Sequence, residues 1–221
     1  MLLRQKISGI IYIGRLDIAE SVEIPTIYID RDPREVNADL DDNYVMIECD
    51  NIQGGYLAGR ELVQKGARNM AVVCHNQNLS TIKKRIQGFC SALKEAGMEF
   101  NPENVVDVQE VSLEEGASAA EYIMKHMPDV DGIFFTSDAL GVGAIGYLTD
   151  VNVKIPEQIK LVGFDDISMA KIVLPRLTTV HQPLEEIGRL AALRILDMIR
   201  GEEIPHKRQR LPVELVVRET T

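Results

Sequence analysis

The chain has 221 residues, of which 45% are hydrophobic and 26% are charged, which is typical of a globular protein with a sizeable core. Its net charge of −10 disfavours unaided DNA binding, because nucleic-acid affinity depends mainly on Lys and Arg neutralising phosphates. No apolar run approaches the roughly 20 residues that cross a bilayer. The N-terminus, interrupted by charge, does not resemble a secretory signal. We therefore expect no membrane partner.

Three cysteines, Cys49, Cys74 and Cys90, show neither metal-ligand nor CxxC spacing. Isolated thiols suit a reducing cytoplasm, where we expect the protein to be located and these residues to pack as small apolar side chains. The one basic cluster, His206–Arg210, is too short to reverse the acidic charge and is expected to be a solvated strand edge.

Apolar runs rich in Ile and Val alternate with longer amphipathic stretches, which predicts parallel sheets with crossover helices on both faces. The predicted strands are Gly9–Ile13, Pro25–Ile29, Val45–Glu48, Met70–Cys74, Val105–Val108, Gly132–Thr136, Leu161–Phe164 and Leu177–Val180. The predicted helices are Ile52–Lys65, Thr81–Ala96, Leu113–His126, Asp138–Thr149 and Leu184–Arg200. Gly66 and Gly97 are expected to end helices, and Ser80 or Thr81 to cap one.

The last extended segment, Arg210–Arg218, contains Pro212. A proline within a strand pattern indicates either an edge strand or a strand that crosses between sheets. A crossing would give two lobes joined by several chain passes.

A GxGxxG match at Gly141, Gly143 and Gly146 follows the strand Gly132–Phe135. Five residues separate that strand from the first glycine, which places the glycines inside the helix rather than in the phosphate-binding turn. Asp138 would cap the helix and repel a pyrophosphate. We expect the glycines to allow close helix–sheet packing, with a nucleotide-dependent enzyme as a remote alternative.

The remaining chemistry argues against catalysis. The four histidines form no ligand pair, and no Gly-x-Ser-x-Gly elbow is present. Asp165 and Asp166 are adjacent at a strand end, so their side chains should point to opposite faces. We expect no catalytic residues, no metal and no cofactor.

Two neighbouring strand ends carry the polar groups that suit a small ligand. The strand Leu161–Phe164 ends in Asp165, and Leu177–Val180 is followed by Gln182. Ligands of open α/β sheets bind beyond the carboxyl ends of strands. A carboxylate and a carboxamide there predict a site for hydroxyl groups.

Six ordered segments resemble the lactose-repressor (LacI/GalR) family of regulators. They are residues 50–73 (Asp-Asn-Ile-Gln-Gly-Gly onward), 80–89 (Ser-Thr-Ile-Lys-Lys-Arg-Ile-Gln-Gly-Phe), 136–144 (Thr-Ser-Asp-Ala-Leu-Gly-Val-Gly-Ala), 163–167 (Gly-Phe-Asp-Asp-Ile), 175–183 (Pro-Arg-Leu-Thr-Thr-Val-His-Gln-Pro) and 211–220 (Leu-Pro-Val-Glu-Leu-Val-Val-Arg-Glu-Thr). The resemblance implies a two-lobed, periplasmic-binding-protein-like fold. The N-terminal lobe would comprise residues 1–66 and 182–212, and the C-terminal lobe residues 67–181 and 213–221.

The same resemblance implies that Arg85 and Asp165 bind the effector, facing each other across a crevice. Their guanidinium and carboxylate groups suit polyols, because each can engage two neighbouring hydroxyls. Thr81, Ser137 and Gln182 match secondary polar contacts. Val111 falls where some members place an aromatic ring.

Each of these residues also has a structural alternative. Arg85 could be salt-bridged along its own helix, and Asp165 could satisfy loop amides. Thr81 could be a helix cap, Ser137 a turn residue, and Gln182 a hinge residue.

The resemblance does not include the first segments of the family. A helix-turn-helix head and the first strand–helix–strand unit of the N-terminal lobe have no counterpart before Leu2–Ile11. We therefore expect that lobe to be truncated. We expect the effector-binding core of a cytoplasmic, homodimeric regulator that binds a sugar or purine and reaches operator DNA only through a head absent from this chain. The alternative is a periplasmic sugar-binding protein that serves a transporter.

Overall fold

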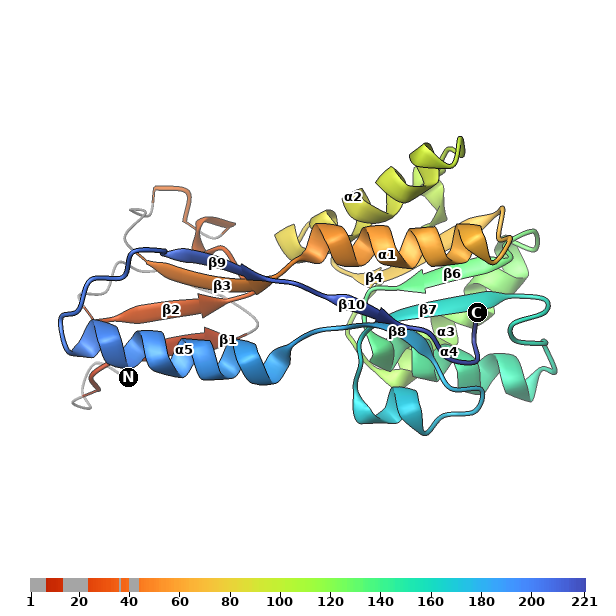
Figure 1. Ribbon diagram of the computed structural model, residues 1–221. Helices are drawn as coiled ribbons and strands as arrows, with labels where there is room; N and C mark the ends of the chain where they lie inside the picture. The colour runs from red at the N-terminus through yellow and green to blue at the C-terminus, as the bar shows by residue number, and fades with distance from the viewer. Residues whose placement is uncertain (1–6, 14–23, 36, 40–43) are drawn as a thin grey trace. The chain divides into compact units, whose positions relative to one another are not determined.

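The computed structural model describes residues 7–13, 24–35, 37–39 and 44–221 (Figure 1). The fold is α/β and divides into two compact units. Unit 1 comprises the described residues up to Asp50 together with residues 183–212, and unit 2 comprises residues 51–182 and 213–221. The chain therefore passes between the units three times. The predicted lobes differ mainly in residues 51–66, which the contacts place in unit 2.

Unit 1 is a four-stranded parallel sheet with one helix packed against it. The strand order is β1-β2-β3-β9, and α5 contacts β1, β2 and β3. These elements are β1 (Ile10–Ile13), β2 (Thr26–Ile29), β3 (Val45–Cys49), α5 (Leu184–Ile199) and β9 (Arg208–Leu211), with a 3-10 turn, η2, at Pro33–Glu35. Residues 1–6, at the start of the segment expected to open the N-terminal lobe, lie outside the described residues.

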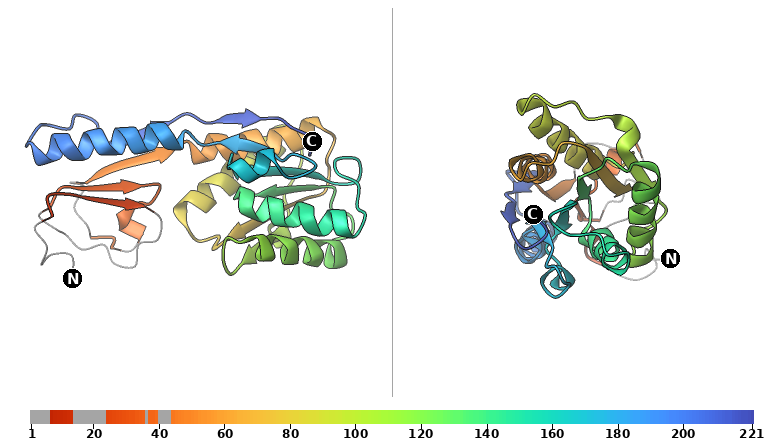
Figure 2. Two further views of the ribbon diagram at one scale, coloured as in Figure 1. Left: turned by 90° about the horizontal axis from the view of Figure 1, so that it is seen from below. Right: turned by 90° about the vertical axis from the view of Figure 1, so that its right-hand side faces the viewer.

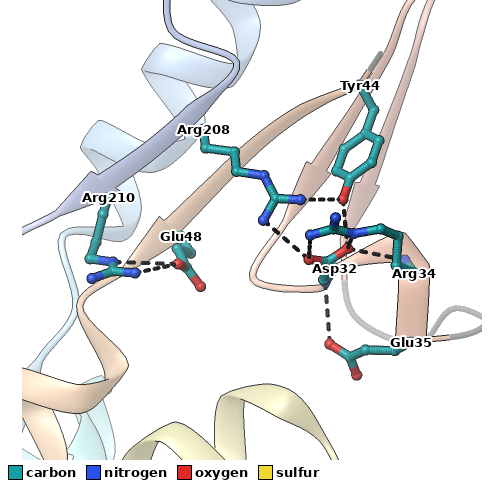
Figure 3. A network of polar contacts seen from close by, with 7 residues as sticks. All are labelled: Asp32, Arg34, Glu35, Tyr44, Glu48, Arg208 and Arg210. Carbon is teal, nitrogen blue, oxygen red and sulfur yellow. Dashed lines mark hydrogen bonds and ion pairs between the residues drawn. The ribbon is translucent and has the colours of Figure 1, made fainter. Parts of the chain in front are cut away.

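The basic cluster lies on an edge strand, as predicted, but its arginines are paired with acidic residues (Figure 3). Arg208 donates hydrogen bonds to Asp32 at 3.3 Å and to the Tyr44 hydroxyl at 2.6 Å. Arg210 lies beside Glu48 of the neighbouring strand, with 3.3 Å between Nη2 and Oε1. The cluster therefore fastens β9 to the sheet.

Unit 2 is a six-stranded sheet, in the order β10-β8-β7-β6-β4-β5, in which only β10 is antiparallel to its neighbour. Helices α1 and α2 cover one face, and α3 and α4 cover the other (Figure 2). The bounds are α1 (Asn51–Gln64), β4 (Met70–His75), α2 (Ser80–Glu95), β5 (Val105–Val108), α3 (Leu113–His126), β6 (Gly132–Phe135), α4 (Asp138–Asp150), β7 (Lys160–Asp165), β8 (Thr178–His181) and β10 (Glu214–Val216), with 3-10 turns η3 (Pro102–Asn104) and η4 (Ser168–Lys171).

This double coverage explains the continuous apolar strands of the sequence. Every residue of β6 is buried, as are the first five of β4. Strands buried on both faces read as unbroken hydrophobic runs rather than alternating ones. No helix within the described ranges is long and apolar enough to cross a membrane.

The strand crossing at Pro212 is present. The preceding residues form β9 in the first sheet, and β10 begins two residues later in the second sheet. Proline cannot donate to a ladder, so it is well placed where neither sheet needs that hydrogen bond.

Helix ends follow the sequence in part. Gly66 and Gly97 have φ of +88° and +72°, which confirms them as left-handed helix ends. The predicted cap of α2 is wrong. The helix already begins at Ser80, so Leu79 occupies the cap position. Leucine has no side-chain acceptor and makes no capping hydrogen bond.

Helices α1 and α2 approach each other closely because glycines stand at the contact. A Cβ on Gly55 would lie 1.8 Å from the Arg85 carbonyl oxygen, and one on Gly88 would lie 1.9 Å from the Ile52 carbonyl oxygen. The crossing of α1 and α2 thus fixes the backbone that carries Arg85.

The glycines of the GxGxxG match lie inside α4, as predicted, but serve different purposes. Gly143 packs helix on helix rather than helix on sheet: its Cβ would lie 1.9 Å from the Leu113 carbonyl oxygen of α3. Gly141 lies against Leu177, and Gly146 meets nothing within 4 Å. The expected helix–sheet role is therefore wrong for Gly143 and Gly146.

Replacing Gly55 by Ala should destabilise the protein by roughly 1–3 kcal/mol or more, because the methyl group would meet a backbone carbonyl that cannot rotate away. Urea unfolding followed by circular dichroism measures the change. Gly146→Ala is the matched control, since it adds a methyl to an open helical position and should be neutral or stabilising by up to about 1 kcal/mol. Equal stability of the two variants would contradict the close crossing.

Candidate functional site

The Asp165 carboxylate is the centre of a polar group at the carboxyl ends of three strands. Asp165 ends β7, Ser137 follows β6, and Gln182 follows β8. The Ser137 hydroxyl donates to Asp165 Oδ2 at 2.9 Å, and Gln182 Nε2 donates to Oδ1 at 2.5 Å. The structure thus brings together the carboxylate and carboxamide that the sequence placed on neighbouring strand ends.

Arg85 reaches the same carboxylate from the second turn of α2. Its Nη1 lies 3.8 Å from Asp165 Oδ1. Arg85 Nε donates to Asn51 Oδ1 at 2.8 Å, and Nη1 donates to the Thr136 carbonyl oxygen at 2.6 Å. The guanidinium also lies 3.5 Å from the centre of the Phe164 ring. Arg85 is buried, so the alternative of a surface residue paired along its own helix is wrong.

The expectation that Arg85 and Asp165 face each other across a crevice needs correction. Both belong to unit 2, and their charged atoms are in contact distance of an ion pair. A ligand therefore has no room between them and would have to bind to both from one side. A buried pair of this kind is stable only when its remaining donors and acceptors are satisfied, which Asn51 and the Thr136 carbonyl do for Arg85.

Asp138 plays a different part from the predicted helix cap. Ser137 holds the cap position of α4, without a side-chain capping bond. Asp138 is fully buried, and it accepts from the Thr179 hydroxyl at 2.5 Å and from the Ile167 amide at 3.0 Å. A Cβ at Gly163 would lie 2.2 Å from Asp138 Oδ1, so only glycine fits there. Asp138 therefore links α4 to β8 and to the turn after β7.

Burial determines the protonation of both carboxyls. It raises the pKa of Asp138 to about 7, and the neighbouring Asp165 charge adds to this, while the hydrogen bond from Thr179 opposes it. Burial also raises the pKa of Asp165, against the lowering effect of the Arg85 charge. The site thus contains two carboxyls whose charges disfavour each other.

Asp166 points away from this group, as predicted for the residue next to Asp165. Its carboxylate accepts hydrogen bonds from Arg218 and His181, and Lys171 Nζ lies 3.4 Å away. Burial opposes ionisation of Asp166, but the bonds from Arg218 hold its pKa below the usual range. The backbone has φ of +123° at Asp165 and +61° at Asp166, a region that non-glycine residues rarely occupy.

The other two predicted residues lie apart from this hydrogen-bonded group. Thr81 is buried in the first turn of α2, four residues before Arg85 and so on the same helix face. Val111 lies in the loop between β5 and α3 with 49% of its surface exposed. Thr81 remains a candidate contact, whereas Val111 is an exposed loop residue.

Sequence reasoning missed the partners that hold the site in place. Neither Asn51 nor Thr179 was predicted as a partner of the site, because both act through contacts with residues far along the chain. The hydroxyl of Thr179, within the strand predicted at Leu177–Val180, is the signal that could have suggested a partner for the buried Asp138. Within the described residues, Gln182 Oε1 is buried and accepts no hydrogen bond. An acceptor in that state is available to a donor from a ligand or water.

Comparison with known proteins shows which family and which relatives this chain is similar to. Residues 60–221 match the family model described as "Periplasmic binding protein-like domain". The HTH-type transcriptional regulator CelR of Thermobifida fusca is 34% identical over 174 residues, which is 79% of this chain and 51% of the relative.

Solved structures agree. A transcriptional regulator CelR–cellobiose complex has a TM-score of 0.81 at 32% identity, covering 90% of this chain and 59% of that one. A LacI family transcriptional regulator from Enterococcus faecium with bound ribose has a TM-score of 0.76 at 28% identity, covering 89% and 70%. The chain spans about half to two thirds of the length of the curated relatives it matches, from 51% to 67% for the first two.

The raised pKa of Asp138 predicts that the protein loses stability as pH rises. The folded state holds a proton that the unfolded state releases near pH 4, so the contribution is complete below pH 4 and is lost by about pH 7, amounting to at most roughly 4 kcal/mol. In Asp138→Asn the decline should be much shallower when unfolding free energy is measured by urea titration from pH 4 to 8. Thr179→Ser keeps the hydroxyl donor and should keep the wild-type slope. An unchanged slope in Asp138→Asn would refute this assignment.

Proposed function

The chain belongs to the periplasmic binding protein-like family, in its LacI/GalR branch, and we propose that it is the effector-binding core of a transcription regulator. The observation that carries this proposal is the buried Arg85–Asp165 pair with Ser137 and Gln182 around it. These groups offer acceptors and donors to hydroxyls at the carboxyl ends of strands.

The effector is a small neutral molecule, with a sugar as the first candidate. The CelR complex contains cellobiose and the Enterococcus faecium regulator contains ribose. Purines remain the second class, because PurR repressors of Haemophilus influenzae are also among the relatives. The protein carries out no catalytic reaction: it binds the effector and changes conformation. That the named relatives are regulators favours this function over a transport protein.

The regulatory step is a shift between two arrangements of the compact units. An effector can drive this shift only if it binds one arrangement more tightly than the other. In a cytoplasmic homodimer, the shift would change how DNA-binding heads, of the kind named in the HTH-type relatives, meet a two-fold operator.

The surface of unit 2 supports the homodimer. Ile172 and Leu174 each expose 73% of their surface, and Met169 exposes 44%, within the short segment formed by η4 and the residues that follow it. Exposed apolar residues gathered in this way are typical of an interface.

Effector binding should be detected by calorimetric titration with pentoses, hexoses, cellobiose and other disaccharides, and purines. Asp165→Asn and Arg85→Lys should each reduce affinity at least about tenfold, because a hydrogen bond to a charged group contributes roughly 1.5–3 kcal/mol. Arg176→Ala breaks a surface ion pair with Glu219 and should bind like wild type. If a folded protein gave no heat with any of these compounds, the proposal would fail.

Dimerisation should be lost or weakened when a charge enters the exposed apolar segment. Ile172→Asp should shift the protein from dimer to monomer in sedimentation velocity, because the aspartate would be desolvated in the interface. Val151→Asp changes another exposed apolar residue, elsewhere in unit 2, and should remain dimeric. A wild-type monomer, or a dimeric Ile172→Asp variant, would rule out this interface.

A further inference from the structure

Two of the three places where the chain passes between units carry a side chain bound to the Arg85–Asp165 pair. Asn51 is the first residue of unit 2, and Gln182 is the last before the chain returns to unit 1. Asn51 accepts from Arg85, and Gln182 donates to Asp165. Only one residue separates β3 from α1, and only two separate β8 from α5. Almost no irregular chain therefore lies between these contacts and the crossings.

One oxygen of the Asp165 carboxylate, Oδ1, already has two partners. A carboxylate offers about four lone-pair positions. Oδ1 accepts from Gln182 Nε2 and faces Arg85 Nη1 at 3.8 Å, whereas Oδ2 accepts from the Ser137 hydroxyl. A ligand hydroxyl that donates to Oδ1 must therefore compete with Gln182 or Arg85.

Gln182 is the donor that is least held by other bonds. Arg85 is fixed by Asn51 and the Thr136 carbonyl, and Ser137 is fixed at the cap position of α4. The backbone amide of Gln182 lies 3.5 Å from the Asp165 carbonyl oxygen, which is at the limit of a hydrogen bond. Its Oε1 has no hydrogen-bond partner among the described residues. The side-chain bond to Asp165 is thus its main tether.

We propose that Gln182 is a positioning residue that ties the backbone at residues 182–183, where the chain leaves unit 2, to Asp165. A ligand hydroxyl takes the place of the Gln182 side-chain amide on Asp165, and the backbone at this crossing is then no longer held by that bond. The crossing at residues 50–51 stays fixed, because Asn51 holds Arg85, which the ligand does not displace. This proposal rests on the proposed effector site and assigns a route by which occupancy reaches the backbone between the units.

The first turn of α5 follows this crossing directly, so its stability shows whether the backbone at residues 182–183 is still held. The Ile187 amide donates to the Pro183 carbonyl oxygen at 2.9 Å, and Ile187 is buried. Release of Gln182 should loosen this turn and speed exchange of the Ile187 amide, which mass spectrometry of peptides covering residues 180–187 can follow.

The first experiment needs no ligand. In the full chain, Gln182→Met and Asp165→Ala should each speed Ile187 exchange about tenfold, and the double variant should be no faster than the faster single variant, because each change removes one partner of the same bond. Asp131→Asn is the control. Its carboxylate accepts the Arg68 and Asn69 amides at 2.8 Å at the other end of the same sheet, and its loss should leave Ile187 exchange unchanged. Multiplying effects, or no effect of Gln182→Met, would overturn the proposal.

The second experiment adds a sugar that binds in the calorimetric panel. Saturated wild type should exchange Ile187 as fast as ligand-free Gln182→Met, and the variant should not change further on adding the sugar. Slower or unchanged exchange in the wild type would also overturn the proposal. If no compound in the panel binds, the proposed function fails on that measurement, while the ligand-free comparison still decides whether Gln182 is tethered through Asp165.

Discussion

The burial of one positive charge, on Arg85, constrains most of what surrounds the site. An uncompensated buried charge costs several kcal/mol, so each of its neighbours must present an acceptor, a carboxylate or a ring face. Asn51 from α1, the Thr136 carbonyl after β6, and Asp165 and Phe164 from β7 do so. The close crossing of α1 and α2 brings Asn51 within reach, which explains why that contact tolerates no side chain at Gly55.

The strained turn after β7 is also held in place by polar contacts of buried side chains. Two successive non-glycine residues with positive φ are held only if surrounding bonds over-determine them. Asp138 binds the Ile167 amide on one side of the turn, and Asp166 is held by Arg218 from the C-terminal segment. The result is that Asp165 and Asp166 point to different partners, so a single strand end supplies one carboxylate for the site and one for anchoring the last strand.

Much of this arrangement follows from the sequence because it depends on local pattern. Unbroken Val and Ile runs located the strands, Gly66 and Gly97 located helix ends, and Pro212 marked the strand that changes sheets. Asp165 and Gln182 could be paired because the carboxyl ends of neighbouring parallel strands meet at one edge. The contacts of Asn51 with Arg85 and of Asp138 with Thr179 could not be predicted, because they join residues 34 and 41 positions apart whose packing depends on the helices above them.

The charges at this edge also constrain the kind of molecule it can hold. Arg85 is the cation of the group, and it already faces Asp165, while Asp138 lies beside them with a pKa near neutrality. An anionic ligand would meet Asp165 at close range and would raise the pKa of both carboxyls further, so its binding would be opposed by the same repulsion that the fold already contains. A hydroxyl donor has the opposite effect, because it favours the charged form of Asp165 and strengthens its attraction to Arg85. These charges support the proposed neutral effector rich in hydroxyl groups over a phosphate or carboxylate of the same size.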